Sequence, residues 1–257
     1  MRARAAYLII STPRSGSTLL CRALESTNLA GTPHEYFRPE GRYWAQYGAR
    51  ADPVTYVDRL LSERASPNGV FGAKVSWRHM LHLEAAFRAL PGYRERRLPD
   101  ILSELFPDLR YVRMTRGDKP RQAISFWKAY QTGAWGRRAG EENGPAASPA
   151  FDFDGIAKIV QMLVDHETGI GEFFAQAEVC PFTVVYEAFV DAYEATVRAV
   201  LQHLGIDVPN DFVVAAPFMA RQADAETDAW VERYYQIMEE RSRGTDATSH
   251  RVLPCPP

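Results

Sequence analysis

Residues 7–24 read YLIISTPRSGSTLLCRAL, and their order of apolar and polar residues predicts a strand, a tight loop and a helix. The apolar run at residues 7–10 has the length of a buried strand, and apolar residues return at helical spacing from residue 17 to about residue 26. Such a junction directs backbone N–H groups and the positive end of a helix dipole at one point, where they favour an anion. An anion site is therefore expected in the loop.

The loop departs from the nucleotide-phosphate pattern G-x-x-x-x-G-K-[ST], in which a lysine reaches the β- and γ-phosphates. Gly16 and Thr18 keep the pattern, whereas Ser11 stands in place of the first glycine. Ser17 stands in place of the lysine, which argues against ATP or GTP as the substrate. Arg14 instead supplies a fixed positive charge within the loop.

The rest of the chain alternates predicted strands with predicted helices. Strands are expected at residues 70–75, 109–114 and 182–186, and helices at residues 53–63, 98–106, 120–130 and 192–204. This alternation predicts an α/β chain with a three-layer, P-loop-like fold, in which helices flank a central, mainly parallel sheet. A single domain is expected over residues 1–241, followed by a flexible C-terminal tail over residues 242–257.

The composition excludes several classes of partner. The formal net charge of −2 provides no general positive field for nucleic acid or for an anionic membrane. No stretch has the roughly 20 apolar residues of a membrane span. The cysteines Cys21, Cys180 and Cys255 are odd in number and widely spaced. This spacing favours a reducing cytoplasm and predicts neither a disulfide framework nor a zinc site.

Two stretches resemble those of a known enzyme family. Residues 13–20, PRSGSTLL, resemble the 5′-phosphosulfate loop of sulfotransferases that use 3′-phosphoadenosine 5′-phosphosulfate (PAPS), and most closely that of the bacterial trehalose 2-sulfotransferase family. Residues 112–125, VRMTRGDKPRQAIS, resemble the segment with which such enzymes bind the 3′-phosphate, and Arg116 and Ser125 occupy the matching positions. A guanidinium suits a dianionic phosphate because it can donate two parallel hydrogen bonds.

Shorter stretches extend the resemblance from residue 7 to about residue 236: TPHEYF (32–37), GAKVSW (72–77), YQTGAW (130–135), VVYEAF (184–189) and RQAD (221–224). Leu19 departs from the cytosolic animal relatives, which usually have tryptophan at this position, so the residue that stacks on adenine stays open.

The resemblance implies an enzyme that moves the sulfuryl group of PAPS to an alcohol without a metal. Sulfuryl transfer resembles phosphoryl transfer, so in-line positioning and charge stabilisation are expected to carry the catalysis. The expected acceptor is a hydroxyl of a sugar, a glycolipid or a glycosylated small molecule, and relatives suggest a homodimer. The expected cofactor-binding residues are Arg14, Ser15, Gly16, Ser17, Thr18, Arg116 and Ser125.

A hydroxyl acceptor is helped by a general base, for which two neighbouring residues are candidates. Glu35 matches the glutamate proposed as the base in the trehalose-sulfating family, whereas cytosolic relatives use a histidine, for which His34 is the candidate. Adjacent side chains in an extended segment point in opposite directions, so one of the two is expected to face the acceptor, and Glu35 is favoured. Arg14 and Lys74 complete the expected catalytic set. For Lys74, a contact with the sulfuryl group or acceptor and a simple exit to solvent are equally open.

Aromatic residues near the predicted loops are candidates for a sugar platform, because sugar rings stack their apolar faces on aromatic rings. The residues expected to bind the acceptor are His34, Tyr36, Trp77, Trp135 and Arg221. Two other functions remain open for the same loop. A small-molecule kinase with a degenerate P-loop would bind ATP with magnesium, and a non-catalytic protein would bind adenosine 3′,5′-bisphosphate without transferring any group.

Overall fold

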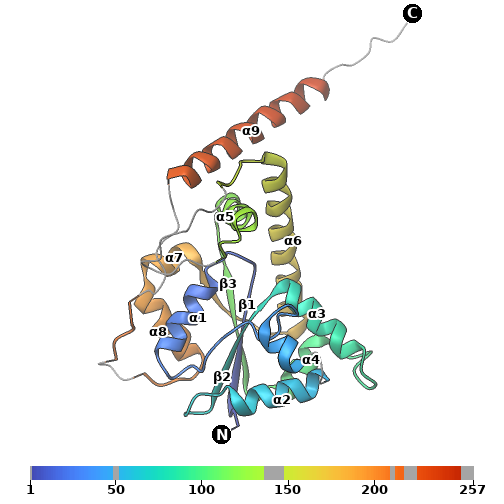
Figure 1. The fold of residues 1–257 in the computed structure, drawn as a ribbon, viewed down its shortest axis with the longest axis vertical. Coiled ribbons are helices and arrows are strands. Elements are labelled where there is room, and N and C mark those ends of the chain that lie inside the picture. The colour runs from blue at the N-terminus through green and yellow to red at the C-terminus, as the bar shows by residue number, and fades with distance from the viewer. Residues whose placement is uncertain (1, 49–51, 136–147, 209–211, 217–224, 250–257) are drawn as a thin grey trace, which may run out of the picture. The chain divides into compact units, whose positions relative to one another are not determined.

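The computed structural model describes residues 2–48, 52–135, 148–208, 212–216 and 225–249 (Figure 1). The chain divides into two compact units. Unit 1 comprises Met1–Gly117 and Leu163–Met219, and unit 2 comprises Asp118–Met162 and Ala220–Pro257. A single domain over residues 1–241 therefore stays a prediction.

Unit 1 is built on a four-stranded parallel sheet in the order β2-β1-β3-β4. The strands are β1 (Ala5–Ser11), β2 (Val70–Ser76), β3 (Leu109–Thr115) and β4 (Phe182–Val185). Strand β1 is internal and buried from residue 6 to residue 11, which explains its continuous apolar run. All four predicted strands are confirmed.

Alternate residues of β1 enter two separate cores. Ala6, Leu8 and Ile10 pack on one face of the sheet, whereas Tyr7 and Ile9 pack on the other. Helices on both faces complete three layers, so the predicted α/β fold is confirmed (Figure 1). The first face is covered by α2 (Pro53–Glu63), α3 (Trp77–Arg88), α4 (Leu98–Leu105) and the C-terminal part of α6 (Phe153–Ala177), and the second by α1 (Ser17–Ser26) and α8 (Tyr193–His203).

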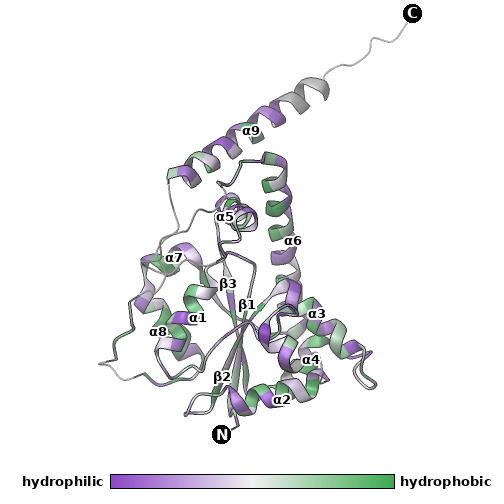
Figure 2. Ribbon diagram, viewed as in Figure 1, coloured by the Kyte–Doolittle hydropathy of each residue, from purple (hydrophilic) through white to green (hydrophobic). Residues whose placement is uncertain are grey.

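The helices of unit 1 bury one side each. In Figure 2, α2 and α4 carry both hydrophobic and hydrophilic residues along their length, as amphipathic helices do. In α2 the buried residues are Tyr56, Val57, Leu60 and Leu61, and Asp52 caps the helix by accepting hydrogen bonds from the backbone N–H groups of its first turn. These local signals explain why the predicted and observed bounds of α2 agree.

No bounds were predicted for the α-helices α3, α6, α7 (Tyr186–Asp191) and α9 (Ala225–Ser249), and the π-helix at Trp44–Gly48 was not predicted. Helix α3 begins directly after β2, so no turn residue marks the change from strand to helix. Helix α6 contains Gly155, Gly169 and Gly171, which lower the helix propensity that local sequence conveys.

Unit 2 holds α5 (Lys119–Thr132), the N-terminal part of α6 and α9. Ion pairs join α5 to α9, with Arg121 at 2.6 Å from Asp228 and Lys128 at 2.6 Å from Glu226. The predicted tail over residues 242–257 falls partly on α9, which is described as far as Ser249, and partly on residues 250–257, which lie outside the described residues. None of the helices in the described ranges combines the length and apolar character that a membrane crossing requires.

Candidate active site

The anion loop, residues 12–18, leaves the carboxyl end of β1 and enters α1. Strand β1 lies between β2 and β3, so the loop stands where successive connections depart to opposite sides of the sheet, the usual ligand position in open α/β folds. Gly16 precedes the first helical residue with φ of 90°, in the left-handed region. A Cβ atom at Gly16 would lie 2.4 Å from Cδ2 of Tyr186 and 3.0 Å from Cε of Met114. The turn therefore requires glycine for two reasons, its φ angle and its lack of a side chain.

We expect Gly16→Ala to lower the free energy of unfolding by about 1–3 kcal/mol more than Gly92→Ala, as measured by chemical denaturation. Gly92 has φ of 86°, and no atom lies within 4 Å of the position that a Cβ would take there, so its alanine variant carries only the backbone strain. Gly16→Ala adds a steric clash with the Tyr186 ring. Equal losses in the two variants would contradict the packing described for the loop.

Arg14 and Arg116 bring two positive charges to the anion loop. Arg116 follows the last residue of β3, and its Nη1 donates a hydrogen bond to the backbone carbonyl of Arg14 at 3.4 Å. Its guanidinium lies 4.5 Å from the centre of the Tyr186 ring. Burial, followed by the neighbouring charge of Arg116, lowers the pKa of Arg14. Two guanidiniums held together with limited hydration create a local field that favours an anion.

Tyr186 and Glu187 belong to this site, although no role was predicted for them individually. The carboxylate of Glu187 accepts a hydrogen bond from the Gly117 N–H at 3.0 Å and lies 3.7 Å from Nε of Arg116. Tyr186 packs on both Gly16 and Arg116. Both residues begin α7 at the end of β4, next to β3 in the sheet. The available signal was an aromatic residue at the end of the predicted strand, Tyr186, and an acidic residue directly after that strand, Glu187.

Ser15 presents a hydroxyl to the interior of the loop. The residue is fully buried, and its Oγ has no hydrogen-bond partner among the described residues. Buried hydroxyls without a partner are uncommon, because the lost hydration costs free energy. The Ser15 hydroxyl is therefore suited to donate to an anion in the loop, as the phosphosulfate of PAPS would require.

Lys74 connects the anion loop to Glu35. Its Nζ donates a hydrogen bond to Thr18 Oγ1 at 3.0 Å and lies 3.2 Å from Oε1 of Glu35. The side chain of Lys74 is 12% exposed, so the predicted alternative of a simple exit to solvent is wrong. The pairing arises because residues 34 and 73 form a parallel bridge, with the Lys74 N–H donating to the His34 carbonyl at 3.0 Å.

Of the two candidates for the general base, Glu35 is the one that is held in its ionised form. Burial raises its pKa, but the charge and hydrogen bond of Lys74, with a smaller effect of Arg38, hold the pKa below its ordinary value. His34 is exposed, and its Nδ1 accepts a hydrogen bond from the Glu35 N–H at 2.8 Å. Partial burial and the Lys74 charge lower the pKa of His34. Glu35, rather than His34, is thus linked to the anion loop through Lys74.

We expect Lys74→Met to raise the pKa of Glu35, because burial is then opposed only by the smaller effects of Arg38 and His79. In the unchanged protein the low pKa stabilises the fold above the unfolded-state pKa of this carboxyl. That contribution is lost as the pH falls through the folded-state pKa. A carbon-13 NMR titration of the Glu35 carboxyl measures the shift, with Lys74→Arg as the charge-preserving control. An unchanged titration midpoint in Lys74→Met would show that Lys74 does not control this carboxyl.

Two residues predicted to bind the acceptor pack in or against the core on the first face of the sheet. Tyr36 is 1% exposed, and its hydroxyl donates to the Thr32 carbonyl at 2.7 Å. Trp77 begins α3 and packs edge-to-face against Phe173, with its ring also filling the space beside Gly169. Tyr36 is thus a core residue and Trp77 is only partly buried, and a contact of either residue with the acceptor stays a prediction.

The remaining predicted residues lie in unit 2 or outside the described residues. Trp135 is 50% exposed and packs edge-on against Phe126 at 5.4 Å between ring centres. Ser125 lies on α5 and is partly buried. Arg221 lies outside the described residues. Within the described ranges, no group of three or more His, Cys, Asp or Glu side chains is placed to hold a metal ion.

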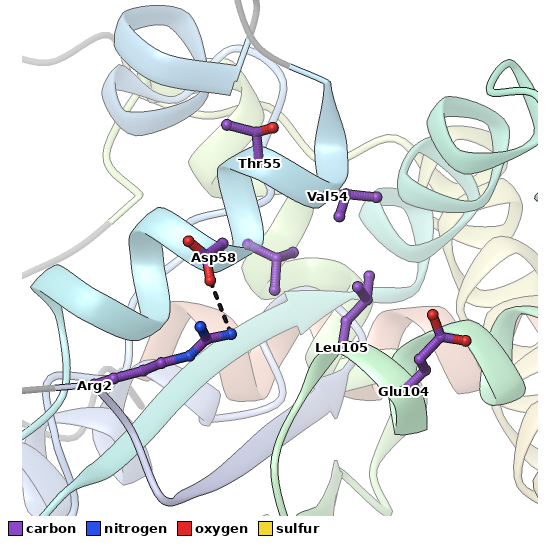
Figure 3. Close-up of a pocket in the computed structure, with 7 residues that line it drawn as sticks. Arg2, Val54, Thr55, Asp58, Glu104 and Leu105 are labelled. Carbon is purple, nitrogen blue, oxygen red and sulfur yellow. Dashed lines mark ion pairs between the residues drawn. The ribbon is translucent and has the colours of Figure 1, made fainter.

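A separate hollow of about 360 Å³ lies away from the anion loop (Figure 3). Arg2 on one wall pairs with Asp58 of α2 on the other at 2.8 Å. Arg2 precedes β1, whereas the anion loop follows it, so Arg2 and the loop lie at opposite ends of this strand. The hollow therefore takes no part in the candidate site. Its lining residues are Arg2, Val54, Thr55, Val57, Asp58, Glu104 and Leu105.

Comparisons with known proteins give consistent results. The family model described as Stf0 sulphotransferase matches residues 6–236. The chain is 30% identical over 259 residues to the trehalose 2-sulfotransferase of Mycobacterium tuberculosis (strain ATCC 35801 / TMC 107 / Erdman), covering 91% of this chain and 95% of the relative. It is also 30% identical over 255 residues to the trehalose 2-sulfotransferase of Mycolicibacterium smegmatis (strain ATCC 700084 / mc(2)155), covering 89% and 94%.

Among solved structures, the chain is similar to the sulfotransferase domain from the curacin biosynthetic pathway, with a TM-score of 0.49 and 17% identity. The similarity covers 88% of this chain and 83% of that domain.

Proposed function

The chain belongs to the Stf0 sulphotransferase family, and from that premise we propose that it transfers the sulfuryl group of PAPS to a hydroxyl of a sugar, a glycolipid or a glycosylated small molecule. One observation supports this proposal above the others. Lys74 contacts both Thr18 of the anion loop, at 3.0 Å, and Glu35, at 3.2 Å. A carboxylate that can accept a proton is thus held beside a loop that can bind the sulfuryl donor, PAPS.

In this proposal the nucleotide is held at both ends. Arg14, together with residues 15–18, holds the 5′-phosphosulfate, and the buried Ser15 hydroxyl supplies one donor. Arg116 and Ser125 hold the 3′-phosphate. As the sulfuryl group leaves, negative charge develops on the 5′-phosphate, and donors already in place stabilise it at little reorganisation cost. The stabilising charges come from the arginine side chains of the chain itself.

The transfer itself is an in-line displacement. The acceptor oxygen forms a bond to sulfur while the bond between sulfur and the 5′-phosphate oxygen breaks, and the acceptor proton passes to Glu35. The ion pair with Lys74 keeps Glu35 ionised but also makes it a weak base. A turn of Lys74 toward the charge that develops on the donor would strengthen the base, since burial alone raises the pKa of Glu35.

The acceptor proposal rests on the relatives, which carry the name trehalose 2-sulfotransferase. Trehalose is therefore the first acceptor to test. The five predicted acceptor-binding residues all remain proposals, and of these His34 and Trp135 have exposed side chains. A cytoplasmic location and a homodimer also remain predictions from the sequence and its resemblance.

A transfer assay tests the proposed function. The protein is incubated with PAPS labelled in the sulfuryl group and with trehalose, glucose or a simple alcohol. The expected result is a labelled sulfate ester on a sugar. Phosphorylation of the same panel by ATP and magnesium would indicate a kinase instead. Binding of adenosine 3′,5′-bisphosphate without transfer to any acceptor would indicate a non-catalytic binding protein.

A further inference from the structure

Glu167 joins the ends of two neighbouring strands within unit 1. It lies on α6, and its Oε1 accepts hydrogen bonds from Thr115 Oγ1 at 2.7 Å and from Thr12 Oγ1 at 3.4 Å. Its Oε2 accepts a hydrogen bond from Nη2 of Arg113 at 2.8 Å. Thr12 directly follows β1 and Thr115 ends β3. One carboxylate is therefore bonded to both strand ends.

These strand ends lead directly into the two arginines of the candidate site. Arg14 lies two residues after Thr12, and Arg116 is the next residue after Thr115. Both connections are too short to allow much independent movement. The distance between the two guanidiniums thus depends on how firmly the strand ends are held relative to each other.

The bonds to Glu167 are shielded from water. The Glu167 side chain is 12% exposed, and Thr12 is fully buried. A carboxylate in such surroundings has lost most of its hydration, so its hydrogen bonds are stronger than those of an exposed group. Arg113 pairs with Glu167 at 2.8 Å, so the carboxylate is not left as a lone buried charge. None of the sequence motifs described above includes Glu167.

We propose that Glu167 is a positioning residue that fixes the spacing between Arg14 and Arg116, and thereby makes the site selective for nucleotides phosphorylated at both the 5′ and 3′ positions. This inference rests on the proposed function. Glu167 acts through Thr12 and Thr115. Two phosphate sites at a fixed spacing reinforce each other, because binding at one raises the effective concentration at the other. A looser spacing reduces this gain for a bisphosphate but changes little for a monophosphate.

Isothermal titration calorimetry tests the proposal with adenosine 3′,5′-bisphosphate, adenosine 5′-monophosphate and adenosine 3′-monophosphate. The measured quantity is the ratio of the bisphosphate affinity to the 5′-monophosphate affinity. Thr115→Val removes the shorter hydroxyl bond while nearly preserving the side-chain shape, and Thr115→Ser keeps the hydroxyl. We expect the ratio to fall about tenfold in Thr115→Val and in Glu167→Gln, and to stay near its original value in Thr115→Ser. The 5′-monophosphate affinity is expected to change less than about threefold.

An unchanged ratio in folded Thr115→Val overturns the proposal, as does an equal fall in all three affinities, which a merely structural role would produce. If Glu167→Gln does not fold, the two Thr115 variants decide alone. If the unchanged protein shows no preference for the bisphosphate, the proposed function fails as well. A preference that is present in the unchanged protein and intact in the variants overturns only the role of Glu167.

Discussion

Replacing Glu35 by glutamine is expected to lower the rate of sulfuryl transfer by roughly 10²–10⁴-fold, the usual contribution of a general base. Glutamine nearly preserves the shape of the side chain but cannot accept a proton from the acceptor hydroxyl. The affinity for adenosine 3′,5′-bisphosphate is expected to stay close to its original value, because the proposed nucleotide contacts do not include Glu35. The measurements are kcat at saturating PAPS and trehalose, and the bisphosphate affinity by calorimetry.

The matched control is His34→Asn, in the residue before Glu35. Asparagine can still accept the hydrogen bond that Nδ1 of His34 accepts from the Glu35 N–H. We expect this variant to keep kcat within about tenfold of the original value, since the histidine takes no proton in the proposed mechanism. The opposite pattern, with Glu35→Gln active and His34→Asn inactive, would make His34 the base.

Replacing Arg116 by alanine is expected to weaken adenosine 3′,5′-bisphosphate binding by about 10²-fold. Hydrogen bonds to a charged partner contribute about 1.5–3 kcal/mol each, and a guanidinium can donate two to one phosphate. The bisphosphate affinity of Arg116→Lys is expected to lie between those of the unchanged protein and Arg116→Ala, because lysine keeps the charge but not the planar pair of donors. The affinity for adenosine 5′-monophosphate is expected to change much less, since it lacks the 3′-phosphate.

Arg88→Ala provides the control for the loss of an arginine as such. Arg88 is 51% exposed and forms an ion pair with Glu84 on the surface of α3. Its removal is expected to leave both nucleotide affinities unchanged within about twofold, because exposed ion pairs contribute little. If Arg116→Ala bound the bisphosphate as tightly as Arg88→Ala does, Arg116 would not be the 3′-phosphate residue.

The sheet and the anion loop could be predicted because their signals are local. The apolar run at residues 7–10 and the polar loop after it are adjacent in the sequence, and both are confirmed as β1 and its connection to α1. The ion pair between Lys74 and Glu35 could not be derived from local pattern. It depends on a parallel bridge between residues 34 and 73, which come from distant parts of the sequence.

The burial of residues on the predicted acceptor side could not be derived from the sequence for a related reason. Tyr36 and Trp77 stand near predicted functional residues, but sequence proximity does not tell which face of the chain is buried. Tyr36 follows Glu35 directly, yet it enters the core while Glu35 faces Lys74. The contacts of Glu167 could not be predicted because this residue lies far along the chain from the loops that it supports. Its helix was not predicted either, since the glycines of α6 lower the helix propensity of the local sequence.

Calorimetry on the unchanged protein tests most directly whether the site holds a bisphosphorylated adenosine through Arg14 and Arg116. Adenosine 3′,5′-bisphosphate and ATP with magnesium are titrated in turn into the protein and into the Arg14→Ala, Arg116→Ala double variant. The expected result is clearly tighter binding of the bisphosphate than of ATP, and loss of that binding in the double variant. Equal binding of the bisphosphate by the two proteins would contradict the proposed site, and with it the proposed transfer of a sulfuryl group from PAPS.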